Sequence, residues 1–420
     1  MTRTERTYYV VFGLYSVPSW FMGPVYPLFL LSRGLDLFQI NVVLATFLIT
    51  SCLLEIPTGA FADIVGRKTS FLLSCAVRTL AFGMYAFTRN FTDCLIAEFI
   101  DAIGFTLANG ALDAWAVDGM HAEGQRGTAD RFFARAQMIA RSMMIGGGIA
   151  CGYIAEYRIE LPWLVAAGGF ACTGVLSAVL MNEPRAPGAA PERWSRMYRS
   201  LGQTVRDGVA TVRNVPVLFL LCGLTMGAAF GSVPAHMLWQ ARVRGLTGEG
   251  LWLMGWLWAL LNLAAVVGSA GVGRLLRRFG REHLLGAAAL GRGMMLALAA
   301  LATTVTPVLT ALLLLEAGFG LSEPLVQALF NEHVPAEQRA TVLSVRSMFF
   351  TLGGGAGLLS IGLVARGFGI PAAWLVSATV LVLSAPGYLV LQRLVQRTAV
   401  DLTRIGVATP PTKVTSAALG

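Results

Sequence analysis

The chain has 420 residues, of which 55% are hydrophobic and 13% are charged, and its formal net charge is +9. A soluble domain carries roughly twice this share of charged residues, because water has to solvate its surface. The composition therefore excludes a soluble globular protein and predicts an all-α polytopic membrane protein. The excess of Lys and Arg is typical of loops on the cytoplasmic side of a lipid bilayer, so we expect no nucleic-acid partner.

A membrane-spanning helix needs about 20 apolar residues, and about twelve runs of the chain meet this length. These runs lie near 8–32, 38–60, 69–89, 93–119, 132–156, 161–181, 216–240, 250–272, 283–305, 308–332, 340–365 and 371–395. A stretch rich in Pro and Arg separates the first six runs from the last six. We therefore expect an N-terminal six-helix bundle at 1–181, a basic cytoplasmic linker at 182–215, a C-terminal six-helix bundle at 216–397 and a disordered cytoplasmic tail at 398–420.

The distribution of basic residues among the loops predicts that both termini are cytoplasmic. The first apolar run follows Met1–Arg6 without an Ala-x-Ala cleavage pattern, so we expect it to be retained as a helix. The six cysteines lie in or beside apolar runs without the spacing of a metal site, and we expect neither a metal nor another cofactor. The sequence contains no nucleophile–base pair and no nucleotide-binding motif, so we do not expect an enzyme.

A charged loop separates the second and third apolar runs and reads Gly59-Ala60-Phe61-Ala62-Asp63-Ile64-Val65-Gly66-Arg67-Lys68. A loop this polar cannot lie in lipid. Its spacing returns in the second half of the chain at Gly273, Gly280 and Arg281, although Arg277 replaces the acid. An arginine inside an apolar run follows each loop at the same distance, Arg78 in the first copy and Arg292 in the second. The chain is therefore expected to consist of two pseudo-symmetric repeats.

The spacing Gly-x3-Asp-x2-Gly-Arg-Lys closely resembles the loop between helices two and three of the major facilitator superfamily of transporters, most nearly its bacterial drug exporters. With the repeated halves and the basic linker, the resemblance covers nearly the whole chain. It implies two bundles that rock around a midplane cavity, a small-molecule substrate, and a monomer in the bacterial inner membrane.

The resemblance also implies a gating role for the charged loops, in which Asp63 meets the start of helix eleven and Arg67 pairs with an acid such as Asp118. Charge-assisted bonds of this kind can bias a rocking equilibrium and still break within a cycle. The residues that we assign to this gating motif are Gly59, Asp63, Gly66, Arg67, Lys68, Asp118, Gly273, Gly280 and Arg281.

Charged side chains inside apolar runs are costly and usually face the interior of a helix bundle or a water-filled cavity. Asp113 and Glu323 lie toward the midplane, and aligning the two halves places Asn109 opposite Glu323 and Gln327 opposite Asp113. Burial favours the protonated form of such a carboxyl and a nearby cation favours the charged form, which is what a proton carrier needs. Proton coupling or substrate contact and a static buried ion pair both remain open for these residues.

Two arginines, Arg141 and Arg346, lie in runs that border the cavity in the family. Each can hold a substrate anion, and each can instead neutralise Asp113 or Glu323. Arg78 and Arg292 are expected to pack against acids of the fourth and tenth runs. Aromatic residues that could line an amphipathic pocket, although most aromatics pack or lie at the membrane interface, are Trp20, Tyr26, Trp115 and Phe230.

The favoured function is proton-driven export of small amphipathic, antibiotic-like molecules, and the alternative is an organic-anion carrier or importer that uses Arg141 and Arg346. A membrane sensor or scaffold is disfavoured, because the linker and tail are too short for a signalling domain. Two departures weaken the drug-export reading without affecting the fold. Glu98 stands where such exporters carry an arginine, and the Gly-Pro pair of helix five is replaced by Gly146-Gly147-Gly148.

Overall fold

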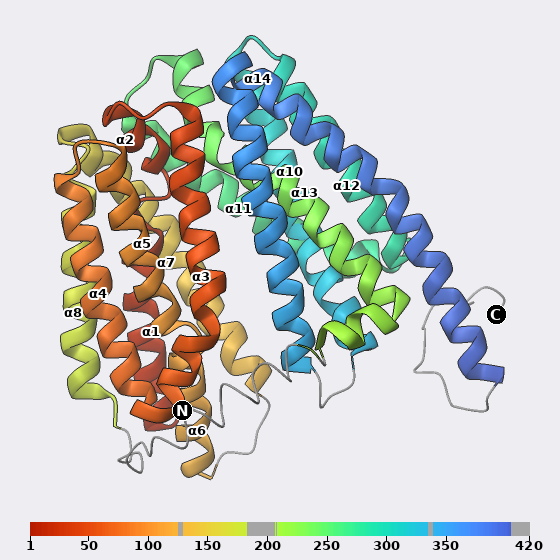
Figure 1. Ribbon diagram of the computed structural model, residues 1–420, viewed down its shortest axis with the longest axis horizontal. Coiled ribbons are helices and arrows are strands. Elements are labelled where there is room, and N and C mark those ends of the chain that lie inside the picture. Colours follow the sequence, from red (N-terminus) through yellow and green to blue (C-terminus); the bar gives the residue numbers. More distant parts are fainter. Residues whose placement is uncertain (125–128, 183–205, 207, 335–338, 405–420) are drawn as a thin grey trace. The chain divides into compact units, whose positions relative to one another are not determined.

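The computed structural model describes residues 1–124, 129–182, 206, 208–334 and 339–404, and every regular element in these ranges is an α-helix. Its contacts divide the chain into two compact units (Figure 1). The first unit holds Met1–Gln203, Val233–Asn262 and Gly354–Ala373, and the second holds Thr204–Ser232, Leu263–Gly353 and Trp374–Gly420. The predicted linker at 182–215 and tail at 398–420 lie largely outside the described residues, so both stay predictions.

The helices follow the predicted apolar runs closely, with a few residues added at most ends. In chain order they are α1 (Arg3–Phe21), α2 (Tyr26–Ser32), α3 (Leu37–Val65), α4 (Arg67–Phe87), α5 (Phe91–Ala108), α6 (Ala111–Ala122), α7 (Ala129–Tyr157), α8 (Leu161–Leu180), α10 (Pro216–Thr247), α11 (Leu251–Leu275), α12 (Arg281–Leu301), α13 (Val305–His333) and α14 (Arg339–Arg404).

Ten segments of the described chain are long and apolar enough to cross a membrane. The run at 8–32 is not among them, and it is divided into α1 and α2. The last two predicted runs fall in α14, which consists of two helices that meet in a kink at Gly369, where φ is +82°. An all-helical chain with many membrane-length helices is therefore confirmed, and the count of twelve stays a prediction.

The fourth predicted helix is also broken, between α5 and α6 at Asn109 and Gly110. Gly110 has a φ of +73°, in the left-handed region that only glycine adopts without strain. Because the helix is broken here, carbonyl groups in the last turn of α5 lose the backbone N–H donors that a continuous helix would supply. Hydroxyls of neighbouring helices replace them, because Ser70 donates to the carbonyl of Leu107 at 2.7 Å and Thr58 donates to that of Thr106 at 3.2 Å. The break is thus a built-in feature of the bundle.

In the first unit, α4 packs against α5 and α8, α3 packs against α5, and α1 packs against α7 and α8. These helices run along one another in Figure 1, where they are coloured red to yellow. An aromatic cluster fills the space between α4 and α8, with the Tyr85 and Trp163 rings stacked at 4.0 Å between centroids. Such ring contacts add to the packing energy of apolar burial.

Part of α11 also belongs to the first unit and lies against α7. A Cβ added at Gly255 would lie 2.7 Å from the carbonyl oxygen of Gly148, and one added at Gly152 would lie 3.0 Å from the backbone nitrogen of Gly255. The Glu156 carboxylate, near the end of α7, accepts the amide hydrogens of Leu251 at 2.6 Å and Trp252 at 3.2 Å. A carboxylate at a helix N-terminus is stabilised by the unpaired amides there, so α7 holds α11 by both packing and charge.

In the second unit, α12 packs against α13, and α13 also passes close to α11. A Cβ added at Gly320 would lie only 1.9 Å from the carbonyl oxygen of Ala265, so no larger residue fits this crossing. Small residues at such crossings are typical of membrane helices, where van der Waals contact replaces the hydrophobic driving force. The unit's core is built from fully buried side chains that include Leu218, Phe330 and Leu391.

We expect the Gly255→Ala variant to be destabilised by about 1–3 kcal/mol, because its methyl group would meet backbone atoms that cannot turn aside. The measurement is the thermal unfolding midpoint of the purified protein in detergent. Gly146→Ala is the matched control on α7, since nothing lies within 4 Å of the added Cβ and alanine favours the helix. Equal midpoints for the two variants would contradict the close crossing of α7 and α11.

Candidate functional site

Two predicted site residues, Asn109 and Asp113, flank the break between α5 and α6. The Asn109 side chain donates to a carboxylate oxygen of Glu55 on α3 at 3.0 Å. The buried Tyr8 hydroxyl of α1 donates to the Asp113 carboxylate at 2.5 Å. The break thus has one polar pair at Asn109, with Glu55, and another one turn into α6, between Asp113 and Tyr8. A broken membrane helix with polar side chains on both sides of the break is a common form of transporter binding site.

In the second unit, the predicted residues Glu323 and Gln327 share one partner. Arg346 of α14 donates to Glu323 at 2.8 Å and to Gln327 at 2.5 Å. The two acceptors are one turn apart on α13, and the guanidinium fork spans both of them. The Phe330 ring lies 5.2 Å from the guanidinium carbon of Arg346. Arg346 is therefore already neutralised, as one of the two interpretations of its role required.

The two charged loops form matching ion pairs. Arg67 contacts Asp118 at 2.6 Å in the first unit, and Arg281 contacts Glu332 at 2.6 Å in the second. Arg67 also lies 3.8 Å from Asp63. Arg67 therefore lies beside the acid that the resemblance implies, and Arg281 and Glu332 form the corresponding pair of the second repeat, while the gating role of both pairs stays a prediction.

The expectation that Gly59–Lys68 forms a loop was wrong, because α3 continues to Val65 and α4 begins at Arg67, so that Gly66 alone joins the two helices. Gly66 ends α3 with a φ of +113°, and the next residue begins α4. The Lys68 ammonium donates to the carbonyls of Ala178 at 2.7 Å and Met181 at 2.5 Å, at the end of α8. Gly280 begins α12, whereas Gly59 and Gly273 lie inside α3 and α11 with nothing within 4 Å of an added Cβ.

Other predicted site residues have no shared location in the described structure. Arg141 is exposed on α7, and no described acid pairs with it. Trp20 is 53% exposed at the end of α1, whereas Trp115 is buried and donates its indole N–H to the Asn182 carbonyl at 3.0 Å. Phe230 is half-buried on α10. Their proposed contacts with a substrate stay predictions.

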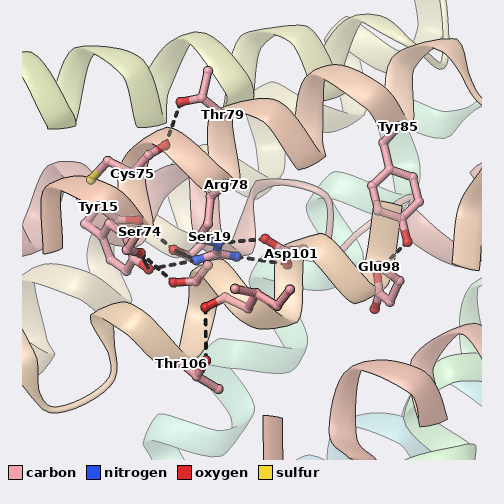
Figure 2. Close-up of polar contacts among 12 residues, drawn as sticks. Tyr15, Ser19, Ser74, Cys75, Arg78, Thr79, Tyr85, Glu98, Asp101 and Thr106 are labelled. Carbon is pink, nitrogen blue, oxygen red and sulfur yellow. Dashed lines mark hydrogen bonds and ion pairs between the residues drawn. The ribbon is translucent and has the colours of Figure 1, made fainter. Parts of the chain in front are cut away.

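A buried polar cluster in the first unit is centred on Arg78 of α4 (Figure 2). Its guanidinium donates twice to Asp101 of α5, at 2.7 and 3.3 Å, which confirms the expected packing against an acid of the fourth run. It also donates to the hydroxyls of Tyr15 at 3.2 Å and Ser19 at 2.8 Å on α1. A buried charge needs partners of this number and geometry, because desolvation is expensive in a membrane.

A glycine makes room for the Arg78 stem. A Cβ added at Gly104 would lie 2.5 Å from Cγ of Arg78, and a Cβ added at the matching Gly318 would lie 2.8 Å from Cγ of Arg292. The two repeats therefore build the same helix contact. In the second repeat, Arg292 donates to the Ser232 hydroxyl at 2.7 Å.

The sequence did not assign Glu98 and the Tyr85 hydroxyl to a site. Both are buried beside the Arg78 cluster, and Tyr85 and Tyr26 donate to the same carboxylate oxygen of Glu98. The only sequence signal was an acid inside an apolar run. No group of three or more metal-ligating side chains lies together in the part of the chain that the structure describes.

We expect Arg78→Met and Asp101→Leu each to lower the free energy of unfolding by about 3–5 kcal/mol, because each leaves one charge buried without its partner. The double variant should lose much less than the sum of the two. The measurement is a double-mutant cycle on thermal or denaturant unfolding in detergent. Arg158→Met is the control, since its exposed contact with Glu160 at 4.0 Å should contribute at most about 1 kcal/mol. Strictly additive losses would show that Arg78 and Asp101 are not coupled.

The family model of the Major Facilitator Superfamily matches residues 8–358 and 255–413. The uncharacterised MFS-type transporter YxaM of Bacillus subtilis is 22% identical over 366 residues, which are 86% of this chain and 89% of YxaM. Multidrug resistance protein MdtG of Escherichia fergusonii is 32% identical over 182 residues, but these are only 42% of this chain and 43% of MdtG.

Among solved structures, the nucleoside transporter NupG has the same fold. Its TM-score is 0.73 at 13% identity, over 93% of this chain and 99% of NupG. The loop spacing, the repeated halves and the paired loop arginines agree with these matches. The chain belongs to the Major Facilitator Superfamily and is a membrane transporter, not an enzyme.

Proposed function

We propose that this transporter exports small amphipathic, antibiotic-like molecules in exchange for protons. The observation that carries the proposal is the break between α5 and α6, with Asn109 and Asp113 on either side of it. Broken helices in transporters expose backbone groups and polar side chains where substrates and coupling ions bind. The protein would act as a monomer in the bacterial inner membrane, with both termini in the cytoplasm.

Asp113 is suited to proton exchange because few groups hydrogen-bond to its carboxylate. One tyrosine hydroxyl donates to it, and no described cation pairs with it. A carboxyl in this setting can take up a proton without breaking an ion pair. A cationic or polar substrate that approaches Asp113 would favour the charged form and release that proton.

Glu323 offers a second acid in a different setting. Glu323 forms an ion pair with Arg346, and 53% of the Glu323 side chain is exposed. Protonation of Glu323 would break its ion pair with Arg346. The hydrogen bond from Arg346 to Gln327 would remain. The two acids would then respond to substrate and proton differently, as coupled exchange requires. The relative MdtG, whose name records multidrug resistance, agrees with export of varied molecules.

The matching ion pairs of the two charged loops support the gating role proposed for them. Arg67 pairs most closely with Asp118 and Arg281 pairs with Glu332, and at least half of each acidic side chain is exposed. Because solvent screens both pairs, each contributes at most about 1 kcal/mol, which can bias a conformational equilibrium and still be broken within a transport cycle.

We expect Asp113→Asn and Glu323→Gln each to abolish substrate flux driven by a pH gradient, because neither amide can carry the proton. The measurement is flux in proteoliposomes across a panel of amphipathic cations, neutral compounds and anions, with and without the gradient. Thermal unfolding establishes that each variant is folded. Asp93→Asn, at an acid in the first turn of α5, is the control and should keep wild-type flux. Undiminished gradient-driven flux in both test variants would remove these acids from the mechanism.

A specific observation favours the alternative of an organic-anion carrier. Arg141 is exposed on a membrane-length helix and pairs with no described acid. An unneutralised guanidinium inside a membrane protein is a natural anion contact, because it can bind a carboxylate or phosphate through two donors. Arg346 is less suited to this role, since Glu323 already occupies it.

For the anion carrier, Arg141→Gln should weaken anion binding by about tenfold or more, because a charge-assisted contact is lost. The measurement is equilibrium binding of the anions in the same panel to the purified protein. Arg158→Gln, a highly exposed arginine beyond the end of α7, is the control and should bind anions as the wild type does. Unchanged anion affinity in Arg141→Gln would exclude the anion contact and leave proton-driven export of amphipathic cations.

A further inference from the structure

The first unit contains a buried acid that the proposed function does not use. Glu98 lies on α5 and is 5% exposed. Its Oε2 atom accepts a hydrogen bond from the Tyr26 hydroxyl at 2.9 Å and another from the Tyr85 hydroxyl. The two hydroxyls are 3.0 Å apart, so the three groups form a closed triangle. Figure 2 shows Tyr85 pointing at Glu98 beside the Arg78 cluster.

The charges around Glu98 do not balance if it is ionised. Arg78 uses its Nε and Nη2 atoms on Asp101 and its Nη1 atom on two hydroxyls of α1, so four of its five N–H donors have partners other than Glu98. No described Lys, Arg or His nitrogen pairs with Glu98. The titratable groups that surround Glu98 are Asp101 and Cys94 on α5, Arg78 and Tyr85 on α4, and Tyr26 on α2. Two carboxyl groups thus face one guanidinium.

A buried carboxylate without a cation is expensive, and such a group keeps a proton instead. With a proton on Glu98 the cluster carries one positive and one negative charge, which matches the single ion pair observed. The repeat alignment places Leu312 and Ala299 at the positions of Glu98 and Tyr85, so the second half has no such triangle. The triangle is therefore not needed to build the helix contact that the two repeats share.

We propose that Glu98, Tyr26 and Tyr85 form a proton-binding site, with Glu98 as the group that gains and loses the proton. The two hydroxyls stabilise the carboxylate when the proton has left, because each donates to it. Asp101 lies one helical turn from Glu98, so Arg78 can share its donors between the two acids in that state. Binding and release need no co-reactant, since the proton is the only species exchanged.

The proton-binding site contacts both sides of the break between α1 and α2, so loss of the proton from Glu98 can alter this break. Arg78 holds Ser19 before the break, and Glu98 holds Tyr26 after it. Between them, the Gly23 carbonyl accepts a hydrogen bond from the buried Gln240 of α10 at 3.0 Å. A shift of Arg78 toward Glu98 would loosen its bond to Ser19. Protonation would therefore be linked to the α1–α2 break and to its contact with α10.

The binding test does not depend on transport. Infrared difference spectra of the purified protein between acidic and alkaline pH report the carbonyl stretch of protonated carboxyl groups. We expect a titrating band that is lost in Glu98→Gln and shifted in frequency in Tyr85→Phe, which lacks one hydrogen bond. Glu160→Gln, an acid ion-paired with Arg33 at 2.7 Å, should keep the band. An unchanged band in Glu98→Gln, or in Tyr85→Phe if the first variant does not fold, would overturn the site.

The role of this site in transport rests on the proposed proton exchange. In proteoliposomes, Glu98→Gln should lose flux driven by a pH gradient and keep substrate exchange without a gradient, because glutamine resembles the protonated acid. Gradient-driven flux equal to the wild type would overturn the coupling role of Glu98. A wild type that shows no gradient-driven flux would refute the proposed function alone, and the infrared titration would still decide whether Glu98 binds a proton.

Discussion

The cost of placing charge inside a membrane is the constraint on which the first unit depends. Arg78 on α4 and Asp101 on α5 lower this cost by forming two charge-assisted hydrogen bonds with each other. Arg78 also donates to two hydroxyls of α1. The contact needs the close approach that Gly104 allows, because an added Cβ would strike the arginine stem. Helix packing and charge neutralisation are therefore one arrangement, and neither can change without the other.

The same constraint explains how a helix can be broken in this environment. Backbone carbonyls freed at the α5–α6 break need donors, since lipid supplies none. Thr58 and Ser70, on the adjacent helices α3 and α4, supply hydroxyls to Thr106 and Leu107. The surrounding bundle thus supports a break that exposes Asn109 and Asp113. Irregular backbone, which would be costly against lipid, becomes a place where polar chemistry is possible.

Much of this structure could be predicted from the sequence because lipid imposes a simple pattern. Run length and loop charge predicted most of the helices, and the family resemblance predicted that Arg67 lies beside an acid such as Asp118. The break at Asn109 and Gly110 was missed, because hydropathy does not change across it, although Asn-Gly is a recognised turn signal. The break before Tyr26 was missed for the same reason.

The chemistry of the site was harder to predict than the helices. Arg346 had two possible acidic partners in the sequence, and only tertiary structure selects Glu323. Glu98 was noted as a departure from a family pattern, whereas its role depends on two tyrosines from other helices. Such partners are distant along the chain, and no spacing rule connects them. A single sequence therefore indicates which residues are costly to bury but not which neighbours compensate them.

The position of Lys68 has a mechanical consequence. Its ammonium fastens the last turn of α8 to the start of α4 through two carbonyl oxygens. A displacement of the last turn of α8 would therefore reach the start of α4, and with it the Arg67 that pairs with Asp118. The junction between α3 and α4 is thus a mechanical anchor as well as an electrostatic contact.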